Sequence, residues 1–343
     1  MSGDPTERLV ECLIRDIDER GPLPFSTFMN RALYDPELGF YERGGAAGGR
    51  RGHFVTSVET GPLFAAVVGE WLDRRWHELG RPDPFLVAEA AAGVGTLWRG
   101  IRRAAPACYP ALHWILVERS ARLRTEHDAL PQGRRSTRAE LPDEAIHVVL
   151  ANELLDNLAF DIAERVVGGW RDVRVGRVDG VFAFVCGGRV ADGPPGEGVA
   201  VGARIPVAVD ALDWLARARA IAARVLVFDY GATTAELAER GIDGWLRTYV
   251  GHGRGPDPLE RPGAADVTHD VPFDQLPTPR TRLCQAEWLG NHGIDDRVAA
   301  AREAWSERAA IGDLEAMFAR SAVAEAEALT DPAGLGGFTV LEW

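Results

Sequence analysis

The pattern of apolar and polar positions predicts alternating buried strands and amphipathic helices in the middle of the chain. Four short apolar runs, each followed by polar or turn residues, cover Phe85–Ala88, Leu112–Val117, Ile146–Ala151 and Arg224–Phe228. Runs of this length are typical of strands that are buried on both faces. Helical periodicity follows the first two runs, over 97–105 and 121–129. Repeated strand–helix–strand units predict a doubly wound α/β sheet with parallel strands.

The N-terminal part has helical periodicity without strands between the helices. Apolar positions predict helices over 5–20, over 27–33 with Ser26 as its N-cap, and over 62–76. We therefore expect residues 1–80 to form an N-terminal helical cap and lid, and residues 81–343 to form the sheet domain.

Two stretches interrupt the strand–helix rhythm and predict insertions at about 162–200 and 240–285. Residues 162–190 alternate as strand material with Gly-rich turns, which predicts an antiparallel insertion. Residues 250–280 are rich in Pro and Gly, and a long loop of this kind usually serves function. The last residues, 337–343, predict a closing strand at an edge of the sheet.

Composition narrows the class of protein. The 343 residues are 46% hydrophobic and 26% charged, which is ordinary for a globular protein, and the net charge of −13 argues against nucleic-acid binding. The four cysteines are widely spaced, so we expect no metal site and no disulfide framework. There is no signal peptide pattern and no apolar run near the roughly 18 residues that span a bilayer, so we expect a cytoplasmic protein without membrane attachment.

The most informative segment is the loop after the first apolar run. Glu89 ends the run, and a small-residue loop with Gly93 and Gly95 leads to Thr96. In open α/β sheets such a loop lies beside a nucleotide-like ligand. The loop lacks the third glycine of the dinucleotide pattern, so it favours S-adenosylmethionine (SAM) over NAD as the cofactor.

Two further strand ends support a SAM site. Glu118 ends the second strand, where an acid can accept hydrogen bonds from ribose hydroxyls, and Asn152 and Glu153 follow the third. Taken singly, these residues are better explained by a turn, a solvated acid and a helix cap. Three such features at successive strand ends, in this order, indicate that Glu89, Gly93, Gly95, Glu118 and Asn152 bind the cofactor.

The chain also resembles a known family, the MidA-like proteins, over nearly its whole length. The matching motifs are Gly21–Met29, Tyr34–Tyr41, Gly52–Glu59, Glu89–Thr96, Ala151–Leu158, Asp229–Gly231, Leu246–His252, Pro262–Gly263 and Asp266–Thr268. The resemblance implies a class I, Rossmann-like SAM-dependent methyltransferase. It also implies a protein arginine side chain as the methyl acceptor, because mitochondrial members methylate an arginine of a respiratory complex I subunit.

The chain departs from the family pattern at the loop itself. Ala91 stands where the family has the first glycine, and Val94 where it has an arginine; His53 replaces an aspartate, and Val58 a proline. Alanine fits such a position readily only where its φ is negative.

Chemistry suggests which residues act on the acceptor. A guanidinium has a pKa above about 12, so it must lose a proton to become a nucleophile, and a carboxylate pair can both hold it and take that proton. Glu153 and Asp156 share one face if a helix begins there, which makes them the candidate catalytic residues. The alternative is that Glu153 only orients SAM and Asp156 caps a loop.

Four residues are candidates for substrate binding: Tyr41, Arg247, Tyr249 and His252. Tyr41 and Thr56 lie in the N-terminal motifs and are candidates for a lid over the cofactor. Thr56 is also a candidate for direct contact with the cofactor. The alternative for Arg247 is a structural ion pair, and for Tyr249 a place in the core.

Other functions remain open from the sequence. One is a small-molecule O- or N-methyltransferase of the same fold, and another is an assembly or scaffold protein without turnover. A homodimer is also compatible with the Trp-rich helices.

Overall fold

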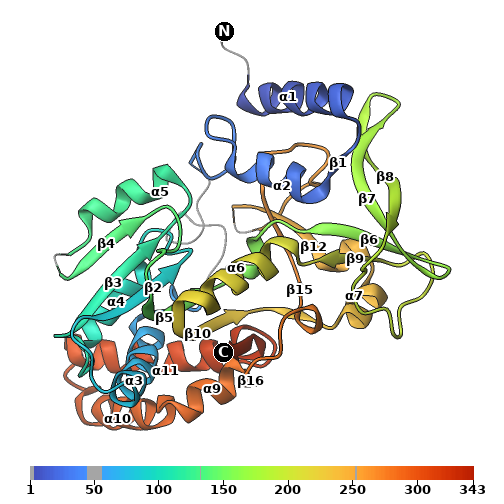
Figure 1. Cartoon of the computed structure of the whole chain (residues 1–343). Coiled ribbons are helices and arrows are strands. Elements are labelled where there is room, and N and C mark those ends of the chain that lie inside the picture. Colours follow the sequence, from blue (N-terminus) through green and yellow to red (C-terminus); the bar gives the residue numbers. More distant parts are fainter. Residues whose placement is uncertain (1–3, 45–55, 132, 252) are drawn as a thin grey trace. The chain divides into compact units, whose positions relative to one another are not determined.

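The computed structural model describes residues 4–44, 56–131, 133–251 and 253–343 (Figure 1). The chain divides into two compact units, each described by itself. The first, called the sheet unit, comprises Val55–Glu153, Ala218–Asp229 and Pro279–Trp343. The second, called the mixed unit, comprises Met1–Phe54, Leu154–Arg217 and Tyr230–Thr278.

The sheet unit is built on a seven-stranded sheet in the order β16-β17-β10-β5-β2-β3-β4. The strands are β2 (Phe85–Ala90), β3 (Leu112–Val117), β4 (Arg135–Arg138), β5 (Ile146–Asn152), β10 (Ala222–Asp229), β16 (Thr281–Cys284) and β17 (Thr339–Glu342). Strands β10, β5, β2, β3 and β4 run parallel, which confirms the doubly wound sheet that the four apolar runs predict.

The C-terminal strand was predicted at an edge of the sheet, and that prediction is wrong. β17 pairs antiparallel with β10 on one side and with β16 on the other. The edge strand β16 is short and half-exposed, and it follows a Pro-rich segment, so no apolar run marks it in the sequence.

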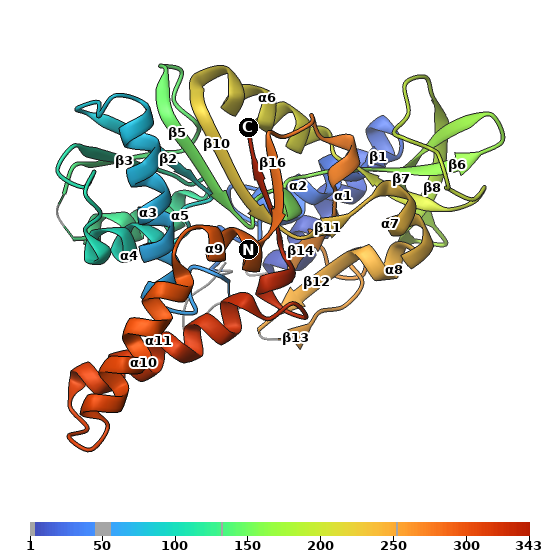
Figure 2. The same cartoon turned by 90° about the horizontal axis from the view of Figure 1, so that it is seen from below.

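Helices of the sheet unit share one core with its strands. They are α3 (Pro62–Glu78), α4 (Thr96–Ala104), α5 (Ala121–Glu126), η1 (His127–Ala129), α9 (Gln285–Asn291), α10 (Ile294–Arg308), α11 (Leu314–Thr330) and η4 (Leu335–Gly337). Trp71 of α3 and Trp98 of α4 are fully buried in this core, together with Phe228 of β10 and Trp288 of α9. Helices α10 and α11 form a helical hairpin at the C-terminal end of the chain (Figure 2).

The described residues of the mixed unit form three smaller sheets and several helices. Its strands are β1 (Leu23–Pro24), β6 (Asp161–Val166), β7 (Gly169–Val178), β8 (Val181–Val190), β9 (Arg204–Val207), β11 (Gly231–Ala232), β12 (Leu246–Val250), β13 (Gly253–Arg254), β14 (Asp266–His269) and β15 (Val271–Pro272). Its helices are α1 (Pro5–Arg20), α2 (Phe25–Tyr34), η2 (Leu155–Asn157), α7 (Thr234–Arg240), α8 (Ile242–Trp245) and η3 (Phe273–Gln275), and the division of units passes through α6 (Val209–Ile221).

The two insertions lie in these sheets. β6, β7 and β8 pair antiparallel, which confirms the antiparallel insertion predicted over 162–190. The Pro/Gly-rich segment 250–280 is less irregular than predicted, because it contributes β14 to an antiparallel sheet with β12 and β13.

The N-terminal helices divide between the units differently from the expected boundary at residue 80. α1 and α2 belong to the mixed unit, whereas α3 packs into the core of the sheet unit. The predicted N-cap at Ser26 is wrong: α2 begins at Phe25 after Pro24, and the Ser26 N–H donates instead to Asp161 Oδ1 at 3.1 Å. Within the described ranges, no helix has the length and apolar character needed to cross a membrane.

Candidate active site

The loop between β2 and α4 has an unusual backbone. Ala91, Gly93 and Gly95 all have positive φ, at 54°, 53° and 76°. Glycine adopts this region without steric cost, whereas alanine does not. Alanine would replace the family's first glycine readily only with a negative φ, but Ala91 has a positive φ. It therefore occupies a backbone conformation that favours glycine. At Gly95 a Cβ would also come within 2.5 Å of Leu130 Cδ1, so the close approach there requires glycine.

Glu118 holds this loop in place from the end of β3. Its Oε2 accepts the Gly93 N–H at 3.0 Å, and its Oε1 accepts the Ser120 N–H at 2.8 Å. On the other side, His127 Nε2 lies 2.8 Å from the Gly93 carbonyl oxygen. A carboxylate has about four lone-pair sites, so these two hydrogen bonds are compatible with a ligand hydroxyl at Glu118. The role of Glu118 at the ribose stays a prediction. Its hydrogen bond to the Gly93 N–H was not predicted from the sequence.

Glu89 is buried in the core of the sheet unit. It is 6% exposed, and Trp114 Nε1 donates to its Oε2 at 2.7 Å. Burial raises its pKa to about 8, although the hydrogen bond from Trp114 acts in the opposite direction. The carboxyl is therefore largely protonated at neutral pH. The predicted contact between Glu89 and the cofactor stays a prediction.

The end of β5 carries polar groups that suit a ligand. Glu153 Oε1 accepts the Asn152 amide at 2.9 Å and the Ser57 N–H at 3.3 Å, and the Glu153 N–H donates to the Phe228 carbonyl. Among the described residues, the buried atoms Thr56 Oγ1 and Asn152 Oδ1 have no hydrogen-bond partner. Buried polar atoms are nearly always satisfied, so these two fit a bound polar molecule such as SAM.

The predicted catalytic pair does not share a helix face. The helical turn η2 covers only Leu155–Asn157, and Glu153 precedes it with a φ of 51°. The two carboxylates have different partners, because Asp156 Oδ2 accepts the hydroxyl of Tyr230. The helix on which the shared face depended does not include Glu153, so the i, i+3 spacing gives no support for the pair. The catalytic roles of Glu153 and Asp156 stay a prediction.

A second buried acid, Asp266, lies in the mixed unit and was not predicted as a site residue. It is 6% exposed, and its Oδ1 accepts the Tyr41 hydroxyl at 2.9 Å and the Asn157 amide at 2.8 Å. The Tyr34 hydroxyl in turn donates to Asn157 Oδ1 at 2.8 Å. The only signal for Asp266 in the sequence is its place in the Asp266–Thr268 motif. Tyr41, predicted at the substrate, is buried in this network.

Two buried aspartates of the mixed unit, Asp156 and Asp266, have raised pKa values. Burial raises the pKa of Asp156 to about 7, with the hydrogen bond from Tyr230 acting against the shift and the negative charge of Asp266 adding to it. Burial likewise raises the pKa of Asp266 to about 6, against the hydrogen bonds from Tyr41 and Asn157. Acids with pKa values near neutrality can take and release protons under physiological conditions.

Arg247 and Tyr249 lie on β12 beside these acids. In the antiparallel register Arg247 is opposite Thr268 and Tyr249 is opposite Asp266. Arg247 forms an ion pair with Asp270 and lies 5.3 Å from the ring centroid of Tyr230. The structural ion pair that the sequence left open for Arg247 is thus present, and Tyr249 is half-buried rather than part of the core. His252 lies outside the described residues.

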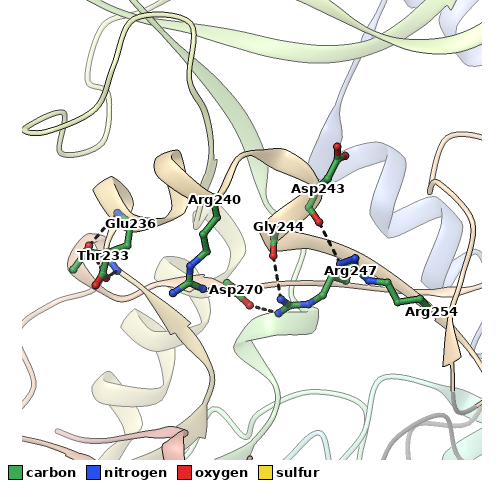
Figure 3. Close-up of polar contacts among 8 residues, drawn as sticks. All are labelled: Thr233, Glu236, Arg240, Asp243, Gly244, Arg247, Arg254 and Asp270. Carbon is green, nitrogen blue, oxygen red and sulfur yellow. Dashed lines mark hydrogen bonds and ion pairs between the residues drawn. The ribbon is translucent and has the colours of Figure 1, made fainter. Parts of the chain in front are cut away.

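Asp270 is shared by two arginines (Figure 3). Arg240 and Arg247 both pair with its carboxylate, which is 5% exposed, and Arg247 also donates to the Gly244 carbonyl at 3.2 Å. Within the part of the chain that the structure describes, no three His, Cys, Asp or Glu side chains are grouped to hold a metal ion.

Comparisons with known proteins place the chain in a protein family. Residues 67–291 match the model of a family described as "Putative S-adenosyl-L-methionine-dependent methyltransferase". The chain is 25% identical over 293 residues to a mitochondrial protein arginine methyltransferase NDUFAF7 homolog of Drosophila melanogaster, an alignment that covers 74% of this chain and 65% of the fly protein. It is 26% identical to the Danio rerio NDUFAF7 protein, with 87% and 79% of the two chains covered.

Solved structures extend the likeness to the whole chain. A superfamily member from Burkholderia thailandensis, crystallised with bound S-adenosyl-homocysteine, superposes with a TM-score of 0.84 at 26% identity, covering 100% of this chain and 94% of that chain. A native crystal structure from the same organism, at 24% identity and a TM-score of 0.81, shows the same fold.

Proposed function

Because the chain belongs to the family of S-adenosyl-L-methionine-dependent methyltransferases, we propose that it methylates an arginine side chain of a partner protein. The observation that carries the cofactor assignment is the positive-φ loop of Ala91, Gly93 and Gly95, which is bonded to Glu118 at the adjacent strand end. The acceptor follows from the relatives, which are named protein arginine methyltransferases.

Several residues of the sheet unit would hold the cofactor. The Gly93–Gly95 backbone permits close approach of a ligand, and Glu118 can accept from its hydroxyls. Thr56 Oγ1 and Asn152 Oδ1 offer buried polar atoms with no partner among the described residues. When bound, SAM would supply a methyl group carried on a sulfonium sulfur. The rest of the molecule is the leaving group, and its sulfur becomes a neutral thioether.

The protein itself must handle the proton of the acceptor. A guanidinium nitrogen that gains a methyl group loses one N–H proton, and a carboxylate can receive it. Asp156 is the candidate base, since burial raises its pKa to about 7 and Tyr230 orients its carboxylate. Glu153, which bonds to Ser57 and Asn152, is suited to orienting groups at the end of β5.

Calorimetry with S-adenosylhomocysteine, followed by mass spectrometry of candidate acceptor proteins incubated with SAM, tests the proposal. We expect saturable cofactor binding and a methyl mass on arginine. No binding at millimolar concentration would refute the enzyme assignment and leave the scaffold alternative. Binding with methyl transfer only to small metabolites would replace the protein acceptor with a small molecule.

A further inference from the structure

Asp266 is a buried carboxyl that only neutral groups contact. Its hydrogen-bond donors are the hydroxyl of Tyr41 and the amide of Asn157, and in the described part of the chain no arginine or histidine lies within ion-pair distance of it. Asn157, the residue that follows Asp156, donates its amide to Asp266 Oδ1 at 2.8 Å, so Asp156 lies near Asp266, whose negative charge raises the pKa of Asp156. Two buried carboxyls placed together are costly when both are ionised, and a bound cation removes that cost.

Two arginines, Arg240 and Arg247, lie near the pair and form ion pairs with Asp270. The positive charge of Arg247 also lowers the pKa of Asp156. Burial lowers the pKa of His269 to about 3, so its ring is neutral. The His269 Nδ1 atom lies 2.9 Å from the Asp156 carbonyl oxygen. When Asp156, Asp266 and Asp270 are all ionised, their three negative charges face the two positive charges of Arg240 and Arg247, so one negative charge is left for an added cation.

A second observation points to a ligand on the same face of the sheet. Thr268 follows Asp266 by two positions on β14, so both side chains lie on one face. Thr268 is 3% exposed, and its Oγ1 has no hydrogen-bond partner among the described residues. Arg247 and Tyr249, opposite Thr268 and Asp266 in the register, lie on that face as well.

We infer that Asp266 and Asp156 form the receptor for a guanidinium cation, with Thr268 Oγ1 as a further acceptor. This inference rests on the proposed function and names the residues that would recognise its acceptor. A guanidinium is planar and has several N–H donors in a fixed fork, which matches carboxylates presented from two elements, η2 and β14. Tyr41 and Tyr230 act as positioning residues, because each donates its hydroxyl to one of the two carboxylates.

Cation binding is linked to protons at this receptor. An opposite charge favours the ionised form of a carboxyl, so a bound guanidinium lowers the raised pKa values of Asp156 and Asp266. Binding therefore releases protons, and affinity rises between about pH 5 and pH 8. The groups that face the pair are Tyr41, Tyr230, His269, Arg247 and Asp270. Burial raises the pKa of Tyr41 and lowers that of His269 to about 3, so neither of these two changes its charge in that range.

The test uses the full chain saturated with S-adenosylhomocysteine and two probes, N-acetyl-arginine methylamide and its lysine counterpart. Titrations followed by NMR should show saturable binding of the arginine probe and weaker binding of the lysine probe. Calorimetry in two buffers of different ionisation enthalpy should show proton release. Absence of arginine-probe binding at tens of millimolar, or equal binding of the lysine probe, would overturn the guanidinium receptor.

Variants separate the receptor from the fold and from catalysis. Asp266→Asn keeps an acceptor for Tyr41 and should lower arginine-probe affinity by about tenfold or more, as expected when a charge-assisted hydrogen bond is lost. Its S-adenosylhomocysteine affinity should match the wild type, which reports intact folding. Asp243→Asn, an exposed acid of the same unit, is the matched control and should change neither affinity.

The outcomes also distinguish this inference from the proposed function. Wild-type probe affinity in Asp266→Asn would refute the receptor even if arginine methylation is found. Probe binding that depends on Asp266, without any methyl transfer, would uphold the receptor and refute the proposed activity. Tyr41→Phe should raise KM for the acceptor more than it lowers kcat, whereas a purely structural role for Tyr41 would also weaken S-adenosylhomocysteine binding.

Discussion

Trp114 donates its indole N–H to the buried carboxyl of Glu89 at 2.7 Å, and this hydrogen bond joins β3 to β2 inside the core of the sheet unit. Burial raises the Glu89 pKa from its usual 4.5 to about 8. Between these two pH values the Glu89 carboxyl stays protonated in the folded protein, whereas it is ionised in the unfolded chain. The stabilising effect of this group is thus complete at low pH and is lost as the pH rises toward 8.

Glu89→Gln should remove that pH dependence while keeping an acceptor for Trp114. Between about pH 5 and pH 8, we expect the wild type to lose on the order of 3 kcal/mol of unfolding free energy relative to the variant. Urea unfolding at both pH values measures it. A constant difference would show that Glu89 ionises normally in the folded state.

Ala91 occupies a left-handed conformation where glycine is favoured, so Ala91→Gly should stabilise the protein. The strain relieved is about 1–2 kcal/mol, and the added freedom of the unfolded chain offsets about half of it, which leaves a gain of about 0.5–1 kcal/mol. The neighbouring Ala92→Gly is the control: it removes a buried methyl group and should destabilise. Thermal unfolding measures the stability of both variants. A loss of stability in both would argue against strain at Ala91.

Glu118→Ala should loosen the cofactor loop, because the Gly93 N–H loses its acceptor. We expect affinity for S-adenosylhomocysteine to fall by about tenfold or more, equivalent to about 1.4 kcal/mol. Glu126→Ala, at an exposed position on α5, should bind like the wild type. Calorimetry compares the three proteins, and unchanged affinity in Glu118→Ala with intact folding would place the cofactor contacts elsewhere.

The ion pairs at Asp270 should differ in their contributions to stability. Arg247 has a side chain 18% exposed and Arg240 one 44% exposed, although both pair with the same buried carboxylate. Asp270→Asn leaves a buried guanidinium without its partner and should cost about 3–5 kcal/mol. Arg240→Ala removes a solvent-screened pair and should cost at most about 1 kcal/mol. Chemical unfolding of the two variants tests this order, and equal losses would contradict it.

Some of the site could be predicted from the sequence because it depends on local pattern. Gly93, Gly95 and Glu118 follow apolar runs that are buried on both faces, and the parallel sheet brings those strand ends to one edge. The contact between Glu118 and the Gly93 N–H follows from that arrangement, although the spacing alone gives no partner for the carboxylate.

Other parts depended on folding across long separations. Glu153 and Asp156 are three residues apart, yet a left-handed residue and a single helical turn give them different partners. Asp266 lies in a Pro/Gly-rich segment whose composition indicates a loop, and only pairing with β12 makes it a buried strand residue beside Tyr41 and Asn157.

The parallel sheet, the antiparallel insertion and the glycine loop with its acid follow from local pattern, because apolar runs and turn residues encode strands and their ends within a few residues. Which carboxyls are buried together depends instead on how distant segments fold against one another. Burial of Asp266 near Asp156 arises from contacts between residues more than a hundred positions apart, such as the hydrogen bond from Asn157 to Asp266, and those contacts, rather than the residue types, raise the pKa values of both acids.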